Sequence, residues 1–464
     1  MYDTIIIGAG MSGLAAGIRL AHYDQRVCIL ERHYTIGGLN SFYRLDGRDY
    51  DVGLHAVTNF TPRGTKKGPL ARLLRQLRFR WEDFSLAPQI GSKIAFPDVT
   101  LEFNNDFGLL ESEVHKYFPA EKDRFAELLG KIVEYDDLES STFDMSAREI
   151  LAATIHDPLL VEMLLCPMMW YGNAREKDMD FGMFSIMFRS IFLEGLARPL
   201  LGVRLILKNL VRRFRSLGGE LKLRHGVQQI VHENEKACGV VLDDGGEISG
   251  RRILSSAGWH ETLRMCGDTV VHDNPAGQLS FVEAMMTLDR QPEQLGHRST
   301  IVFFNDSKDF TWQNPSQTCD VRTGVIASPN NYQYGHVDGE PGQLDEGTIR
   351  VTALANHQRW FEMPEEEYRL EKLRWLDRIV ASSVRFMPDF RRHIVATDFF
   401  TPKTIRRFTW HENGAVYGAP DKHLDGTTPL ENLYICGTDQ GYVGIIGSIV
   451  SGITMANRYC LRTA

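Results

Sequence analysis

The residues best suited to chemistry are three glycines near the start of the chain, spaced as G-x-G-x-x-G. Gly8, Gly10 and Gly13 come directly after the β-branched run Ile5-Ile6-Ile7, and an apolar stretch over residues 14–20 follows them. This order predicts a strand, a tight turn and a helix whose N-terminal N–H groups and dipole face a diphosphate. Gly8 would form the turn, Gly10 would admit the pyrophosphate to the backbone, and Gly13 would let the helix pack closely on the strand.

A carboxylate follows at the distance that a nucleotide ribose requires. A second strand is predicted over residues 27–30, and Glu31 comes next, eighteen residues after Gly13. Glu31 could accept hydrogen bonds from ribose hydroxyls and would repel a 2′-phosphate. Three glycines alone are a weak signal, whereas glycines in this strand–turn–helix–strand–Glu order predict a dinucleotide site.

Two glycine-containing segments after Glu31 extend this site. Gly37 and Gly38 suit a loop that runs back beneath the diphosphate, although paired glycines also occur in ordinary turns. Gly53 and His55 then lie on a strand-like stretch over residues 50–55. Both segments are expected to follow the dinucleotide toward its ring.

The far end of the chain carries a second set of cofactor-type residues. A predicted strand over residues 432–436 leads to Gly437 and Asp439, and an apolar helix is predicted over residues 448–459. Asp439 can bind ribityl hydroxyls, and the helix N-terminus can face the flavin pyrimidine, where reduced flavin carries negative charge. A dinucleotide held from both ends of the chain indicates FAD rather than NAD.

As a set, Glu31, Gly37-Gly38 and the terminal Gly437-Thr438-Asp439 segment resemble the flavin-containing amine oxidase superfamily. Within it, the chain resembles the group of phytoene desaturases, carotenoid isomerases and retinol saturases through Asp51-x-Gly53-x-His55, Tyr117-Phe118-Pro119, Gly414-Ala415-Val416-Tyr417-Gly418 and Asn432-Leu433-Tyr434. The last two motifs, with Gly444-Ile445-Ile446-Gly447, are most similar to the saturase branch. The resemblance implies an α/β protein with a Rossmann-type, GR2-like FAD-binding domain and an inserted mixed α+β substrate domain. One corner departs from the family, because Pro199-Leu200-Leu201-Gly202 stands where Pro-x-Gly-Gly is usual.

The resemblance also assigns residues to the FAD site. Val227 would lie on a strand that passes the adenine and would make backbone hydrogen bonds to it. Together with the motifs above, the residues predicted to contact FAD are Gly8, Ala9, Gly10, Met11, Ser12, Gly13, Glu31, Arg32, Gly37, Gly38, Leu39, Asn40, Ser41, Gly53, Leu54, His55, Val227, Ser256, Gly437, Asp439, Ile446, Gly447 and Ile449.

Fewer residues can be proposed for the chemistry itself. His55 is a candidate for orienting or exchanging a proton near neutral pH, and Tyr442, in the turn before the last helix, is a second candidate. The alternative for His55 is a hydrogen bond to cofactor or backbone without a chemical role. Trp170-Tyr171 and Trp410-His411 either line an apolar tunnel or belong to the core.

The length of the chain, 464 residues, is too great for one core and predicts two domains. The FAD-binding domain is predicted to combine residues 1–74, 205–275 and 395–464. Residues 75–204 are predicted to form a largely helical substrate or membrane-contact region, with apolar residues recurring over 125–133 and 159–165. Residues 276–394 are predicted to add a sheet and a helix to the substrate domain.

Composition narrows the classes of function. A net charge of −8 without a basic stripe argues against a nucleic-acid partner. Seven cysteines without a C-x-x-C spacing predict free thiols in a reducing compartment, with neither a disulfide framework nor a metal site. The first strand begins almost at the first residue, so a cytoplasmic protein without a leader is expected.

One bulky apolar run, over residues 181–196, leaves open a contact with a membrane surface. Basic residues lie among and after its phenylalanines, as an interfacial helix would require. The alternative is a core helix of the substrate domain. No stretch of eighteen uninterrupted apolar residues occurs, so no membrane-spanning helix is predicted.

The sequence therefore predicts an FAD-dependent oxidoreductase. The resemblance implies a carbon–carbon bond of an apolar isoprenoid or carotenoid-like polyene as the target, with hydride passing to or from flavin N5. Desaturation, saturation and isomerisation all remain open, as does the oligomeric state. The alternatives are a flavin amine oxidase and a flavin-free prenyl-binding protein of the Rab GDP-dissociation inhibitor type.

Overall fold

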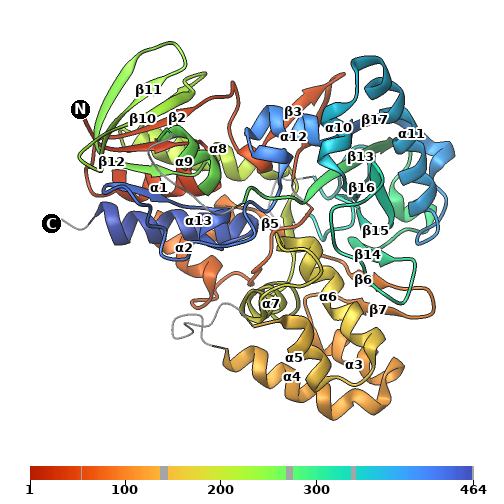
Figure 1. Cartoon of the computed structure of the whole chain (residues 1–464). Coiled ribbons are helices and arrows are strands. Elements are labelled where there is room, and N and C mark those ends of the chain that lie inside the picture. Colours follow the sequence, from red (N-terminus) through yellow and green to blue (C-terminus); the bar gives the residue numbers. More distant parts are fainter. Residues whose placement is uncertain (54, 136–144, 268–274, 336–340, 462–464) are drawn as a thin grey trace.

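The computed structural model describes residues 1–53, 55–135, 145–267, 275–335 and 341–461. Two sheets, each with its own helices, lie side by side, and a cluster of helices lies below the second sheet (Figure 1). Both chain termini lie in the lobe built on the first sheet. The predicted α/β class with an inserted α+β region is confirmed.

The first sheet collects strands from the beginning, middle and end of the chain. Its seven strands are β1 (Tyr2–Ile7), β2 (Val27–Glu31), β9 (Glu220–Leu223), β10 (Val227–Glu233), β11 (Lys236–Leu242), β12 (Glu247–Ser255) and β18 (Leu433–Ile435). β1 pairs in parallel with β2 and β12, and β12 pairs in parallel with β18. The carboxyl ends of these four strands therefore meet at one edge, where open α/β sheets bind ligands.

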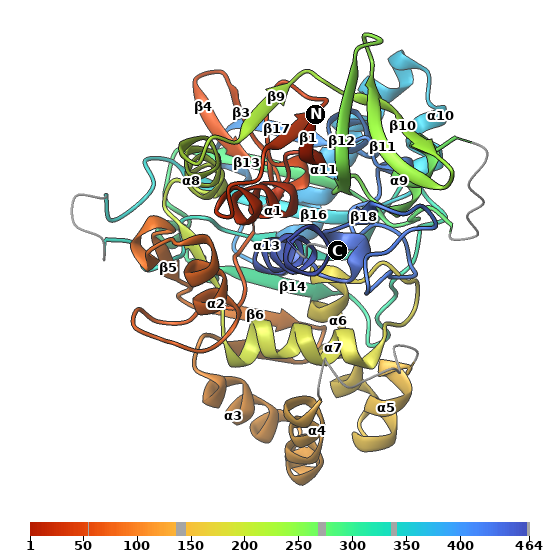
Figure 2. The same cartoon turned by 90° about the vertical axis from the view of Figure 1, so that its left-hand side faces the viewer.

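Helices cover this sheet and share a core with it. They are α1 (Met11–Ala21), α2 (Pro69–Leu77), α8 (Val203–Ser216), α9 (Trp259–Met265) and α13 (Gly444–Met455). α1 and α13 lie next to each other (Figure 2), and a side chain at Gly452 would place its Cβ 2.0 Å from the carbonyl oxygen of Ser12. The two ends of the chain are thus packed in direct backbone contact.

The second sheet is almost wholly antiparallel and lies between helices. Its order is β17 (Ile394–Phe400), β13 (Ser280–Leu288), β16 (Gly347–Ala355), β15 (Cys319–Ala327), β14 (Ile301–Asn305), β6 (Ser92–Ala95) and β7 (Thr100–Phe103). α11 (Glu365–Ser383) packs on one face through Trp375 and Ile379. Every residue of β13 is buried. Shorter helices α10 (His357–Glu362) and α12 (Pro402–Thr409) lie at the end nearest the first sheet (Figure 1).

The region predicted to be largely helical is more mixed than expected. Residues 75–204 do supply α3 (Phe107–Tyr117), α4 (Lys122–Glu134), α5 (Ala147–Thr154), α6 (Pro158–Gly172) and α7 (Phe181–Phe188). They also supply β6 and β7 to the second sheet, and two strands, β5 (Leu86–Pro88) and β8 (Ala197–Pro199), that pair with each other. The strands are only three or four residues long, so hydrophobic periodicity could not identify them.

The bulky apolar run over residues 181–196 lies in the protein interior. Phe184, Phe188 and Ile191 are completely buried, and Phe192 is 1% exposed. This burial supports the alternative of a core helix for the run. No helix in the described part of the chain combines the length and the apolar character that crossing a bilayer would need.

Candidate functional site

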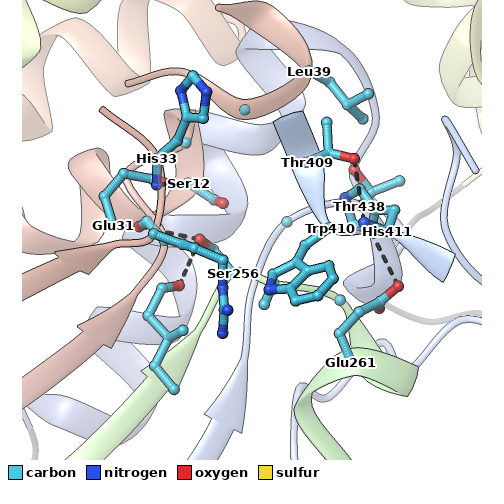
Figure 3. A pocket seen from close by; sticks show the side chains of 18 of the residues that line it. Ser12, Glu31, His33, Leu39, Ser256, Glu261, Thr409, Trp410, His411 and Thr438 are labelled. Carbon is cyan, nitrogen blue, oxygen red and sulfur yellow. Dashed lines mark hydrogen bonds and ion pairs between the residues drawn. The ribbon is translucent and has the colours of Figure 1, made fainter. Parts of the chain in front are cut away.

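A cavity of about 400 Å³ lies at the carboxyl edge of the first sheet (Figure 3). Four strand ends contribute to its wall, through Ile7 at the end of β1, Glu31 at the end of β2, Ser256 after β12 and Cys436 after β18. The cavity therefore occupies the position where this class of sheet binds nucleotides.

All seven cysteines are free, as predicted, and burial raises the pKa of Cys436, which lines this cavity, to about 12.

The glycine turn after β1 borders this cavity as the sequence predicts. Gly8 has a φ of 95°, which favours glycine, and a Cβ on Gly13 would lie 2.2 Å from the Gly8 carbonyl oxygen. A Cβ on Gly10 would meet nothing within 4 Å, because Gly10 faces the cavity. No side chain caps the N-terminus of α1, so its N–H groups are free to bind an anion.

Glu31 lies beside the turn and takes part in holding it. Its Oε2 accepts a hydrogen bond from the Ala9 N–H at 2.8 Å, and its Oε1 accepts one from the His33 N–H at 2.9 Å. Burial raises the pKa of this carboxyl group, which the two N–H groups oppose. An ionised carboxylate has about four acceptor sites, so Glu31 can still accept ribose hydroxyls from the cavity side.

Arg32 crosses the cavity at the end predicted to hold adenine. Its Nη1 lies 2.8 Å from Asp243 Oδ2, and its Nη2 donates to the Val227 carbonyl oxygen at 2.6 Å. The guanidinium lies 4.6 Å from the ring centroid of Trp410, which projects into the cavity (Figure 3). Val227 was predicted to hydrogen-bond adenine through its backbone, and in this structure its carbonyl oxygen accepts from Arg32.

Asp439 also lines the cavity. Its Oδ2 accepts from the Trp259 N–H at 2.6 Å, and its Oδ1 accepts from the Ala419 N–H at 2.8 Å. Lys422 Nζ lies 3.5 Å from Oδ1, and burial lowers the pKa of this lysine. The carboxylate therefore ties two separate segments, at Trp259 and at residues 419–422, to the corner at Gly437.

A second cavity of about 170 Å³ opens beside the first. The two share Leu39, Asn40, Thr438 and Ser448 as wall residues. The rest of the second wall is mainly apolar and aromatic and comes from both lobes, including Trp170, Tyr171, Phe281, Phe303, Val325, Phe400, Val416, Tyr417 and Val443. Trp170-Tyr171 thus line an apolar space, whereas Trp410-His411 line the first cavity.

The family model described as flavin containing amine oxidoreductase matches residues 11–459. The chain belongs to this family. Its cofactor is FAD, and the protein is a flavin-containing oxidoreductase. The predicted alternative of a flavin-free binding protein is accordingly set aside.

Proteins of similar sequence or structure match this flavoenzyme over nearly its whole length. It is 24% identical over 505 residues to prolycopene isomerase from Daucus carota, across 98% of this chain and 80% of that protein. It is 22% identical over 525 residues to all-trans-retinol 13,14-reductase from Danio rerio, across 97% and 85%. A crystal structure of an oxidoreductase from Methanosarcina mazei has the same fold, with a TM-score of 0.68 and 16% identity across 98% and 100% of the two chains. The predicted resemblance to the carotenoid and retinol group is confirmed.

The first cavity of the flavoenzyme has wall residues that suit FAD. An uncapped helix N-terminus and open space at Gly10 suit a diphosphate, while Glu31 and Asp439 each contribute a carboxylate to the wall. Of the predicted contact residues, those that line this cavity are Gly8, Gly10, Met11, Ser12, Glu31, Arg32, Gly37, Gly38, Leu39, Asn40, Val227, Ser256, Gly437 and Asp439. Gly53 and His55 line the second cavity instead.

The remaining predicted contact residues line neither cavity. Ala9 and Gly13 shape the turn, and Ile446 and Ile449 are completely buried in the core beneath α13. Ser41 and Gly447 also line neither cavity, and Leu54 lies outside the described residues. The catalytic candidate Tyr442 lines neither cavity and lies next to Gly447 in space. Ile446 and Ile449 were predicted as contacts because almost every residue of this helix is apolar or small, so the sequence does not show which side of α13 faces the cavity.

His55 lies in the second cavity, where burial changes its chemistry. Its Nε2 is 3.2 Å from Thr352 Oγ1, and Nδ1 has no partner among the described residues. Burial, with the charges of Arg350 and Arg198, holds the pKa of His55 well below its usual value of 6.5. The imidazole is therefore neutral at neutral pH, and its ring contact is to the Thr352 side chain rather than to the backbone partner that the sequence offered as an alternative.

One charged residue of the second cavity was not predicted from the sequence. Glu283, on β13, lines the cavity and is 8% exposed, and its Oε1 lies 2.5 Å from Nε of Arg350. A single acidic residue inside the otherwise apolar run Phe281-Val282-Glu283-Ala284-Met285 was the available signal. Such a residue in a buried strand is costly unless it is paired, and here Arg350 pairs with it.

Proposed function

We propose that this flavoenzyme acts on a carbon–carbon bond of an apolar isoprenoid or carotenoid-like polyene. The main support for this proposal is the second cavity, which adjoins the cofactor cavity and is lined mainly by apolar and aromatic side chains. Apolar ligands bind in such concave, largely preformed sites. The relatives named for prolycopene and for all-trans-retinol support the same substrate class.

In this proposal the shared wall of the two cavities marks the place of reaction. FAD supplies the exchange of a hydride with a substrate carbon, as the chemistry of a flavin allows. Leu39, Asn40, Thr438 and Ser448 would position the ring between the two spaces. The aromatic wall would hold the polyene and exclude water, which protects a charged intermediate on the substrate.

An amine oxidase is the second candidate, because Glu283 places a carboxylate in an aromatic-walled cavity. Both candidates could use this carboxylate, which is paired with Arg350. The relatives named for prolycopene and all-trans-retinol favour the polyene over an amine.

Two assays separate the candidates. The chain is expressed in cells that make C30 or C40 polyenes, and the pigments are compared with those of cells carrying an inactive variant. Purified yellow protein is also given a panel of amines while hydrogen peroxide is measured. A changed polyene without amine-dependent peroxide supports the proposal, whereas peroxide from amines with unchanged pigments contradicts it.

A further inference from the structure

Glu283 is the single acidic residue among the described residues that line the second cavity, and burial raises the pKa of its carboxyl group against the opposing effect of Arg350. Glu283 projects into a space whose other wall residues are apolar, aromatic or uncharged at neutral pH. Two of these, Tyr171 and Tyr417, donate their hydroxyl protons to the carbonyl oxygens of Ala56 and Trp170. Neither tyrosine hydroxyl is therefore available as a base, and burial raises the pKa of each.

The sheet holds the Glu283 carboxylate in a fixed place. Glu283 on β13 lies directly opposite Thr352 on β16, and Arg350 lies two residues before Thr352 on the same face. Arg350 is 2% exposed, and it also donates from Nη2 to the Val52 carbonyl oxygen. Nε of Arg350 donates a hydrogen bond to Oε1 of Glu283, so Oε2 is the oxygen that can contact a ligand.

The proposed chemistry requires a group with these properties. When a hydride leaves a polyene carbon, the substrate becomes a delocalised cation, and desaturation is complete once a neighbouring carbon loses a proton. The electrons of that C–H bond then form the new double bond, while the hydride pair stays on the flavin. An anion in an apolar space stabilises the cation strongly, because water does not screen it.

We propose that Glu283 is the catalytic residue that stabilises this positive charge and exchanges the proton with the substrate carbon. For desaturation, the carboxylate accepts the proton released as the double bond forms. For saturation, the protonated carboxyl gives a proton to the polyene, and the resulting cation accepts the hydride from reduced flavin. The inference rests on the function proposed above.

A cationic mimic of the intermediate tests this assignment without turnover. The probe is N,N-dimethylgeranylamine, an isoprenoid ammonium ion, and its uncharged hydrocarbon analogue is the reference. Binding to the FAD-loaded protein is followed by the change in flavin absorbance. We expect the wild type to bind the cation at least about tenfold more tightly, as one charge-assisted contact allows. Glu283→Gln should remove that preference, and Glu283→Asp should retain part of it.

Control variants guard against a loss of folding. Asp398→Asn removes a carboxylate from the neighbouring strand β17, where Asp398 accepts a hydrogen bond from the Tyr43 hydroxyl outside the cavity wall. It should keep the full preference for the cation. If Glu283→Gln folds poorly because Arg350 loses its partner, Glu283→Gln with Arg350→Met removes both charges and should likewise abolish the preference.

The outcomes also separate this inference from the proposed function. A wild type that converts a polyene, together with a Glu283→Gln variant that keeps the cation preference and the turnover rate, overturns the role of Glu283 alone. A wild type that oxidises the amine probe with release of peroxide overturns the polyene function. Loss of cation preference and of polyene turnover in Glu283→Gln, with FAD retained, supports both.

Discussion

His411 and Glu261 face each other at the wall of the cofactor cavity, with Nδ1 of the histidine 3.4 Å from Oε1 of the glutamate (Figure 3). Each side chain is 15% exposed. Burial by itself lowers the pKa of His411, but the hydrogen bond and charge of Glu261 outweigh it, and the pKa is raised. Burial raises the pKa of Glu261, but His411 outweighs it, and that pKa is lowered.

These two shifts predict how stability depends on pH. The contribution of His411 is complete below its usual pKa of 6.5 and is lost as the pH rises through the higher pKa of the folded protein. The contribution of Glu261 is present above its usual pKa of 4.5 and is lost as the pH falls through its lower folded value. The pair should stabilise most between pH 4.5 and 6.5.

The pair can be isolated by substitution. We expect His411→Gln to lower the free energy of unfolding by roughly 1 kcal/mol at pH 5.5 and by less at pH 8.5. Thermal or denaturant unfolding at the two pH values measures the difference. An equal loss at both values would show that the ion pair does not carry the effect.

Gly10→Val should remove FAD without unfolding the chain. Gly10 has a φ of −74° and open space where a Cβ would lie, so the backbone accepts a side chain there. The added isopropyl group would occupy the space predicted for the diphosphate. Absorbance near about 450 nm reports bound flavin, and circular dichroism reports the fold.

The comparison variant for this turn is Gly13→Val. A Cβ at Gly13 would lie 2.2 Å from the Gly8 carbonyl oxygen, so this variant should lose the packing of α1 as well as FAD. A Gly10→Val protein that stays fully yellow would contradict the assignment of the turn to the diphosphate.

Glu31→Ala should weaken FAD binding and also destabilise the protein without cofactor. The substitution leaves the N–H groups of Ala9 and His33 without the carboxylate that accepts from them. Each such loss costs about 1–3 kcal/mol. Cofactor titration measures the first effect, and unfolding of flavin-depleted protein measures the second. Unchanged stability of the depleted protein would show that the carboxylate does not hold the turn.

Val325→Phe should obstruct the second cavity and leave the first intact. Val325 lies on β15, lines the cavity of about 170 Å³ and does not line the cofactor cavity. We expect retained FAD and a strong loss of polyene conversion, with an overpacking cost of about 1–3 kcal/mol. Val325→Ala, which enlarges the cavity, is the control and should remain active. Full activity of the phenylalanine variant would place the substrate elsewhere.

Part of this fold could be predicted because its signals are local. The turn at Gly8 needs a positive φ and Gly13 needs the absence of a Cβ, so residue type and spacing alone mark the βαβ unit. The helix near the C-terminus was predicted four residues late, since α13 begins at Gly444 rather than at Ser448. Glycine has a low helix propensity, which hides a helix that begins with one.

Other parts depended on contacts that no local pattern records. β6 and β7 join the second sheet because β14, some two hundred residues later, pairs with β6. Trp410-His411 were expected either in an apolar tunnel or in the core, yet they line the cofactor cavity, because the chain after α12 directs them toward Arg32 and Glu261. Neither placement follows from the residues next to these in the chain.

The FAD site could be predicted from residue type and spacing, because a diphosphate turn depends on backbone geometry and glycine position, and Glu31 and Asp439 follow strands at opposite ends of the chain. The composition of the second cavity depends on tertiary structure: β13 and β16 bring Glu283, Thr352 and Arg350 together, and the loop after β4 (Arg48–Asp51) adds His55. These residues are far apart in the chain, and only the pairing of the strands gives them one cavity and one electrostatic environment.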